Sequence, residues 1–123
     1  MKRIKFDPKG PAMRVEINYL GAITASYVYI LWGATSNARV DERSGNNQND
    51  QDDRYELPMP VDSNLLRKVE VFSILKNGDS VNLKAVVVIK IFQGNKKIGE
   101  VKEEELIDAK KTVINDIFIQ LIK

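Results

Sequence analysis

Two tyrosines, an arginine and a glutamate in the N-terminal part of the chain have the types and the spacing of a binding surface. Two neighbouring segments alternate apolar and polar side chains, and the Gly-Ala pair between them is typical of a tight hairpin turn. Such a hairpin would place Arg14 opposite Tyr29 and Glu16 opposite Tyr27, all on one face. Tyrosine and arginine are enriched in protein interfaces. We therefore expect these four residues to bind a protein partner or a second copy of the chain.

The other face of this hairpin is expected to lie in the core. It carries the apolar set Met13, Val15, Ile17 and Tyr19 beside Val28, Ile30 and Trp32. In the alternative interpretation another element covers the tyrosine face, because mixed aromatic faces in β-sandwiches are commonly packed against a second layer. The two tyrosines would then be core residues.

A second group of candidate ligands is acidic. Asp50, Asp52 and Asp53 supply carboxylate oxygens, which are the ligands that Ca²⁺ prefers. Their spacing does not match an EF-hand loop, because no glutamate stands at the twelfth position. They are weak calcium candidates only, and we expect no bound metal and no cofactor.

These acids belong to a long polar segment. Residues 41–54 contain no apolar side chain, and five acids stand there against two arginines. A segment that buries nothing apolar has nothing to offset the entropy cost of ordering. We expect a polar, acidic loop at about 41–65, with residues 44–53 flexible and dispensable for folding.

The chain has no cysteine and no histidine. It therefore lacks the thiolate nucleophile, the commonest general base and the commonest transition-metal ligand. No glycine-rich phosphate-binding motif is present. We expect a protein that is not an enzyme.

The charge balance argues against nucleic acid as a partner. Lysine and arginine number 19 against 17 aspartates and glutamates, a net charge of +2. The basic residues are scattered and largely compensated, whereas a nucleic-acid surface concentrates them. A small barrel that binds nucleic acid is the least favoured of three functional hypotheses.

The elements that must position these residues are predicted to be strands. Residues 67–75, 81–92 and 96–102 continue the period-two alternation. The Asn77-Gly78 and Gly94-Asn95 pairs between them are typical hairpin turns. We expect two further hairpins.

The longest strand should lie at the centre of the core, with Val87 and Ile89 in its middle. A bulge at Gly99 in the following strand would bring Val101 opposite Ile89 and so keep apolar residues paired.

The C-terminal segment is ambiguous. Acidic residues followed by apolar residues at helical spacing favour a short helical turn over 103–111. Residues 113–122 are rich in isoleucine, valine and phenylalanine, which favours a strand. A helix over the whole segment is the alternative, since short apolar runs fit both periods.

Together these patterns predict one domain over residues 1–123, an all-β antiparallel sandwich of about six or seven strands. The uncharged stretch 17–38 is too rich in polar residues for a membrane span, and no signal peptide is evident, so a cytoplasmic location is the default. The leading functional hypothesis is a non-enzymatic protein-binding or assembly module that acts through a sheet face and loops. The alternative is a ligand-binding sandwich for carbohydrate or calcium that uses the acidic loop.

Overall fold

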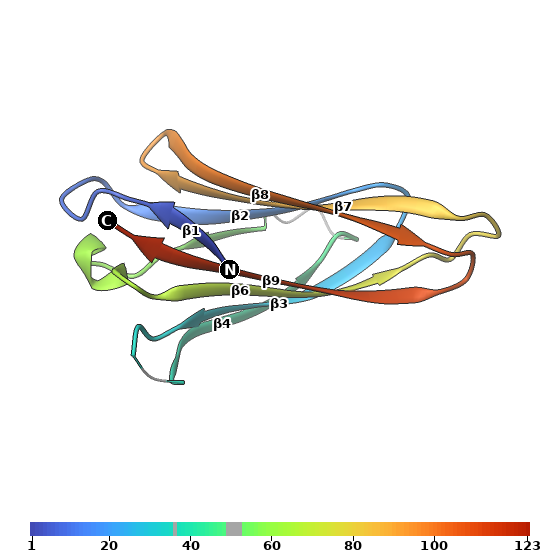
Figure 1. The fold of residues 1–123 in the computed structure, drawn as a ribbon, viewed down its shortest axis with the longest axis horizontal. Helices are drawn as coiled ribbons and strands as arrows, with labels where there is room; N and C mark the ends of the chain where they lie inside the picture. The colour runs from blue at the N-terminus through green and yellow to red at the C-terminus, as the bar shows by residue number, and fades with distance from the viewer. Residues whose placement is uncertain (36, 49–52) are drawn as a thin grey trace.

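Strands with apolar residues at every second position form two sheets that pack face to face (Figure 1). The computed structural model describes residues 1–35, 37–48 and 53–123. The five-stranded sheet has the order β1 (Lys2–Lys5), β9 (Thr112–Ile122), β6 (Lys68–Lys76), β3 (Thr24–Trp32) and β4 (Arg39–Asn46). The four-stranded sheet has the order β5 (Arg54–Glu56), β2 (Met13–Leu20), β7 (Leu83–Gln93) and β8 (Lys96–Ile107). All pairs are antiparallel except β1 with β9. The expected all-β antiparallel sandwich is confirmed, but the described residues form nine strands where about six or seven were expected.

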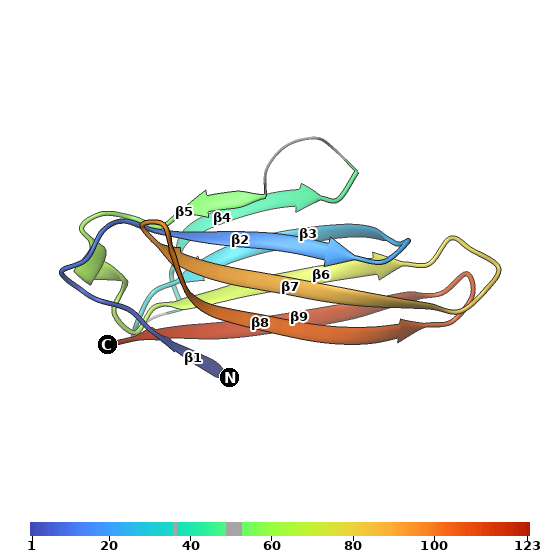
Figure 2. The same cartoon turned by 90° about the horizontal axis from the view of Figure 1, so that it is seen from above.

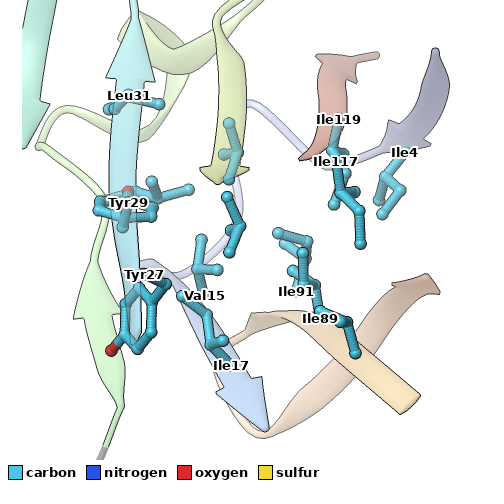
Figure 3. Close-up of a cluster of buried hydrophobic side chains, with 14 of the residues drawn as sticks. Ile4, Val15, Ile17, Tyr27, Tyr29, Leu31, Ile89, Ile91, Ile117 and Ile119 are labelled. Carbon is cyan, nitrogen blue, oxygen red and sulfur yellow. The ribbon is translucent and has the colours of Figure 1, made fainter. Parts of the chain in front are cut away.

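The core lies between the two sheets and is built mainly from the inward positions of β2, β3, β6, β7 and β9 (Figure 3). The strand β7 contributes an unbroken inward row of Ala85, Val87, Ile89 and Ile91, all fully buried. The predicted central position of Val87 and Ile89 is therefore confirmed. The facing sheet contributes inward rows from β3, β6 and β9, so the inward apolar side chains of these strands are shielded from water.

The expected hairpin of the first two long strands is wrong. The strands β2 and β3 lie in different sheets: β2 pairs with β7, so that Ile17 lies opposite Ile89, and β3 pairs with β4 and β6. The connection between them crosses from one sheet to the other at Gly21. This glycine has a φ of +112°, and a Cβ there would lie 2.5 Å from the carbonyl oxygen of Lys84. The turn needs glycine, but it does not pair the strands that it joins.

The second expected hairpin, at Asn77-Gly78, is wrong for the same reason. The strands on its two sides, β6 and β7, also lie in different sheets. Asn77 is buried, and its side-chain amide donates to the carbonyl oxygens of Val81 at 2.8 Å and Ile107 at 2.9 Å. Its side-chain oxygen accepts from the amide of Asp79 at 2.8 Å. The Asn77 side chain thus supplies hydrogen-bond partners to main-chain groups of the loop that have no neighbouring strand to pair with.

The third hairpin is confirmed. The turn at Gly94, which has a φ of +59°, joins β7 to β8 as antiparallel neighbours. Val101 lies opposite Ile89, as expected from a bulge in this strand. The bulge itself starts one residue earlier, because Ile91 pairs with Gly99 and Ile98 is the extra residue.

The segment expected to be a loop contains two strands. The strand β4 covers residues 39–46 and pairs with the outer edge of β3, while β5 pairs with β2. A polar sequence suits β4, because an edge strand exposes most of its side chains. Residues 49–52 lie outside the described residues. The expected flexibility of residues 44–53 is therefore wrong for residues 44–46 in β4.

The C-terminal segment is strand throughout, apart from the turn between β8 and β9. The helical turn expected over 103–111 and the alternative full helix are both wrong, and the strand expected over 113–122 is confirmed. Pairing with β7 extends β8 to Ile107, so the tertiary ladder overrides the helical spacing of the sequence. Lys110 adopts a φ of +62° in the turn that follows. No helix among residues 1–35, 37–48 and 53–123 is long and apolar enough to cross a membrane.

Candidate functional site

The residues predicted to form a partner surface do not share a face. Tyr27 and Tyr29 point into the core and are 3% and 0% exposed (Figure 3). Arg14 and Glu16 lie on the outer face of the other sheet. The expected pairing of Arg14 with Tyr29 and of Glu16 with Tyr27 is wrong, because β2 and β3 are not neighbours.

Arg14 has other partners than those expected. Its guanidinium lies 4.2 Å from the ring centroid of Phe92, on the neighbouring strand β7. It donates to the Glu16 carboxylate and to the carbonyl oxygen of Gly94, both at 2.8 Å. The cation–π contact therefore exists, but with a phenylalanine of the same sheet.

The four tyrosines of the chain form one cluster between the sheets, near β4 and β5. Tyr29 stacks on Tyr55 at a centroid distance of 4.7 Å, and Tyr27 lies between Tyr55 and Tyr19. The Tyr27 hydroxyl donates to Asp53 at 2.6 Å. Burial raises the pKa of Tyr27 and of Tyr29 above the ordinary tyrosine value, so both hydroxyls stay neutral. The alternative interpretation of these tyrosines as core residues is the correct one.

One of the three calcium candidates, Asp53, is hydrogen-bonded to this tyrosine cluster. Asp53 accepts the Tyr27 hydroxyl, which uses one of its carboxylate oxygens. Asp50 and Asp52 lie outside the described residues. Within the part of the chain that the structure describes, no three acidic side chains lie close enough together to hold a metal ion.

The outer face of the five-stranded sheet carries a contiguous set of apolar side chains, which we call the apolar face. Strand register brings together Val28, Ile30, Phe72, Ile74, Ile114 and Phe118. Ile114 is 62% exposed, Ile74 42% and Phe118 39%. The outer face of the four-stranded sheet differs, because lysines, arginines and glutamates occupy most of its positions. Of the two outer faces, the apolar face is the one that leaves large apolar side chains in adjacent positions in water.

Sequence reasoning placed part of the apolar face in the core. The alternation predicts Val28, Ile30 and Trp32 inward and Tyr27, Tyr29 and Leu31 outward, whereas the structure has the opposite arrangement. The signal for a second apolar face was present in the sequence, because β3, β6 and β9 carry large apolar residues at both even and odd positions. Only one face of each strand can enter the core, so the other had to face solvent or a partner.

Two carboxylates lie inside the apolar face. Glu70 is only 9% exposed and accepts a hydrogen bond from the Trp32 indole at 2.9 Å. Asp116, on the adjacent strand, lies close enough to Glu70 for the two carboxylates to influence each other's protonation. Loss of solvation, together with the neighbouring charges of Glu70 and Glu103, raises the pKa of Asp116 to about 6. Among the described residues, no lysine or arginine lies within ion-pair distance of either carboxylate.

A pocket of about 650 Å³ opens at one end of the apolar face. Its walls are Trp32, Phe118, Glu70, Lys68, Arg39 and Asn37. The Arg39 guanidinium lies 5.4 Å from the centroid of the Trp32 ring. Aromatic surfaces, a buried carboxylate and two cations thus meet in one open hollow.

Replacement of Asp116 by asparagine should stabilise the protein at neutral pH. Because the folded pKa of about 6 exceeds the reference value of 3.8, the folded state binds this proton more tightly than the unfolded state. The contribution of Asp116 to stability is therefore present below about pH 4 and is lost as the pH rises through about 6. We expect Asp116→Asn to gain about 0.5–1 kcal/mol at pH 7.5, a value reduced by solvent screening, and almost nothing at pH 4.

Urea denaturation of both proteins at the two pH values measures this difference. The control is Glu104→Gln, which removes an exposed carboxylate that pairs with Lys84 at 3.2 Å. No gain in stability is expected for the control at pH 7.5. An equal gain for Asp116→Asn at both pH values would show that the crowding of carboxylates is not the cause.

Comparison of the chain with protein-family models, with curated protein sequences and with solved structures gives no match. Function is therefore inferred from the geometry of the described residues alone.

Proposed function

We propose that this protein is a non-enzymatic protein-binding module and that its contact surface is the apolar face of the five-stranded sheet. The observation that carries the proposal is the adjacency of apolar side chains on three neighbouring strands, of which Ile74 on β6 and Ile114 and Phe118 on β9 are exposed. Ile74 and Ile114 lie directly opposite each other, and Val28 lies directly opposite Phe72. Soluble monomers seldom leave such a set in water, and contiguous apolar patches commonly mark interaction surfaces.

The rigidity of the surface supports the same proposal. The side chains stand on paired strands in the middle of a sheet, with β6 flanked by β3 and β9. A surface that is already ordered loses little conformational entropy on binding. The apolar centre is bordered by polar residues of β4 and by the charged residues Lys68 and Arg39, as in interfaces with a polar rim.

The charges inside the face indicate the chemistry of the partner. Glu70 and Asp116 have no cation of their own within ion-pair distance among the described residues. A partner that brings a lysine or arginine between Phe72 and Phe118 would neutralise both carboxylates and contact the aromatic rings. The proposed partner is therefore a protein surface with apolar side chains around a basic residue.

A photoreactive benzoylphenylalanine in place of Ile74 tests the proposal in the cells that produce the protein. Ile74 is exposed at the centre of the apolar face. The matched control places the same group at Leu20, which is 55% exposed on the other sheet. We expect a discrete cross-linked adduct from position 74 and none from position 20.

The adduct should also depend on the carboxylates. Adding Asp116→Lys to the position-74 variant should reduce the yield of adduct about tenfold, because it repels the partner's basic residue. An adduct between two copies of the chain would identify the partner as a second copy. Equal yields of cross-linked adduct from positions 74 and 20 would contradict the proposal. So would a yield from position 74 that is unchanged by Asp116→Lys.

A small-molecule ligand is the second candidate, and the pocket beside Trp32 is the observation that favours it. Trp32 and Phe118 offer aromatic surfaces on which a sugar ring can stack, while Glu70 and Asn37 offer hydrogen-bonding groups. This hypothesis keeps the carbohydrate ligand predicted from the sequence but moves it from the acidic segment to the sheet face.

A further inference from the structure

The strand β9 has a free edge along its N-terminal half. Its neighbour β1 is only four residues long and pairs with Ile119–Ile122 (Figures 1 and 2). On its other side β9 pairs with β6 continuously from Thr112 to Gln120. Residues 112–118 therefore have a strand on one side and, among the described residues, none on the other.

The backbone groups that point toward this free edge can be identified from the alternation of the strand. The carbonyl oxygen of Ile122 accepts from Phe6, on the β1 side, whereas that of Leu121 accepts from Leu66, on the β6 side. The register with β6 has no shift, so the even-numbered residues face the edge throughout. Thr112, Ile114 and Asp116 thus present unpaired main-chain donors and acceptors, which is the template for strand addition.

A groove runs along this edge from the point where β1 begins. Its volume is about 480 Å³, and it is lined by Met1 and Lys2 at the β1 end, by Val101 and Glu103 of β8, and by Asp116, Ile117 and Phe118 of β9. Val101 and Ile117 make its apolar surfaces. Carboxylates stand on both walls, since Glu103 comes from β8 and Asp116 from β9.

The charge of the groove selects its occupant. Lys2 is the one basic side chain of the lining, while the two carboxylates Glu103 and Asp116 both line it, and the charge of Glu103 helps to raise the pKa of Asp116. The strand β1, which already pairs with the C-terminal part of the same edge, shows which side chains this edge accepts. β1 places the basic Lys2, Arg3 and Lys5 around the buried Ile4, which lies opposite Leu121.

We infer that the free edge of β9 at residues 112–118 binds an extended, basic peptide segment as an added strand. Main-chain hydrogen bonds to Ile114 and Asp116 would supply affinity, as in other cases of β-strand addition. Alternating lysine or arginine side chains would meet Glu103 and Asp116, and an apolar side chain between them would enter the groove. The same carboxylates disfavour an acidic strand or the edge of a second copy, which carries the same charges.

A synthetic peptide with the sequence of residues 1–6, added to the full chain, is the probe. We expect it to slow the hydrogen exchange of the Ile114 and Asp116 amides, because these become paired. A peptide with glutamate at each basic position should not do so. Raising the salt concentration about tenfold should weaken binding of the basic peptide, because exposed charges are screened.

Charge-reversal variants test whether the peptide binds in the groove and not elsewhere on the surface. They compare the groove carboxylates of β8 and β9 with a neighbouring carboxylate of β8 that lies outside the groove. Glu103→Lys combined with Asp116→Lys should weaken peptide binding at least about tenfold. Glu104→Lys, a reversal on the opposite side of the same strand, should leave binding unchanged. Circular dichroism shows whether each variant keeps its sheet structure, and Glu103→Gln serves if the double variant unfolds.

Three results would overturn the inference. One is the absence of binding of the basic peptide at millimolar concentration. Another is equal binding by the Glu103/Asp116 and Glu104 variants. The third is protection confined to Phe6 and residues 119–122, which would mean that the peptide replaces β1. Ile74→Ser, which removes part of the apolar face, should not affect peptide binding, so failure here and failure of the proposed function are distinguishable.

Discussion

Replacing Tyr29 by alanine should cost about 3–5 kcal/mol of the free energy of unfolding, the range for deleting a large buried aromatic side chain. Tyr29 is completely buried and stacks on Tyr55 at a centroid distance of 4.7 Å and an interplanar angle of 11°. Its removal leaves a cavity between two sheets that are held apart by other core residues. Chemical denaturation monitored by circular dichroism measures the loss.

The matched variant Tyr29→Phe should behave in the opposite way. The Tyr29 hydroxyl is buried and has no hydrogen-bond partner among the described residues. An unsatisfied buried hydroxyl is unfavourable, so Tyr29→Phe should be neutral or stabilising by up to about 1 kcal/mol. The comparison is Tyr27→Phe, which loses the 2.6 Å hydrogen bond to Asp53 and should cost about 1–2 kcal/mol.

These three variants decide where the tyrosines lie. A loss below about 1 kcal/mol for Tyr29→Ala would place this side chain on the surface and would restore the outward orientation of the β3 tyrosines. Equal losses for Tyr27→Phe and Tyr29→Phe would show that the two hydroxyls have similar partners.

Replacing Ile89 by alanine should cost about 2–5 kcal/mol. Ile89 is fully buried at the middle of β7, with Ile17 on one neighbouring strand and Val101 on the other. Both flanking strands are continuous there, so the backbone cannot easily move to fill the cavity, and a value toward the upper end of the range is expected.

The control for this variant is Lys84→Ala on the same strand. Lys84 is exposed and makes one surface ion pair with Glu104, so its loss should change stability by no more than about 1 kcal/mol. Thermal unfolding should give the same ranking of the two variants as denaturant. Similar small effects for Ile89→Ala and Lys84→Ala would mean that the inward and outward faces of β7 are wrongly assigned.

Features that depend on neighbouring residues could be predicted from the sequence. Alternation identified the strands β2, β3, β6 and β7 and the start of β8, because a half-buried strand needs an apolar residue at every second position. It also identified the inward faces of β2 and β7, where the opposite positions are mostly polar. The Gly94-Asn95 hairpin followed from the turn, and Val101 opposite Ile89 from the apolar pairing that the bulge restores.

The partner of each strand was decided by the tertiary structure. At Gly21 and at Asn77 the turn residues suit a reversal of the chain, but the chain crosses to the other sheet at both places. Alternation is satisfied whether two successive strands pair or face each other, so local sequence cannot choose between a hairpin and a crossing. The choice depends on burial by strands that are distant in the chain.

The composition of the candidate site was also decided by the tertiary structure. The strand β3 carries large side chains on both faces, and only the packing of Tyr27 and Tyr29 against Tyr55 settles which face is buried. The apolar face then joins β3, β6 and β9, and the free edge of β9 depends on the short reach of β1. The sequence determined the long alternating strands β2, β3, β6 and β7, because alternation depends on spacing along the chain. The strands β4 and β5 and the C-terminal half of β8 form through pairing with their neighbours. The tertiary structure decided which side chains meet, because neighbours in a sandwich come from strands that are far apart in sequence.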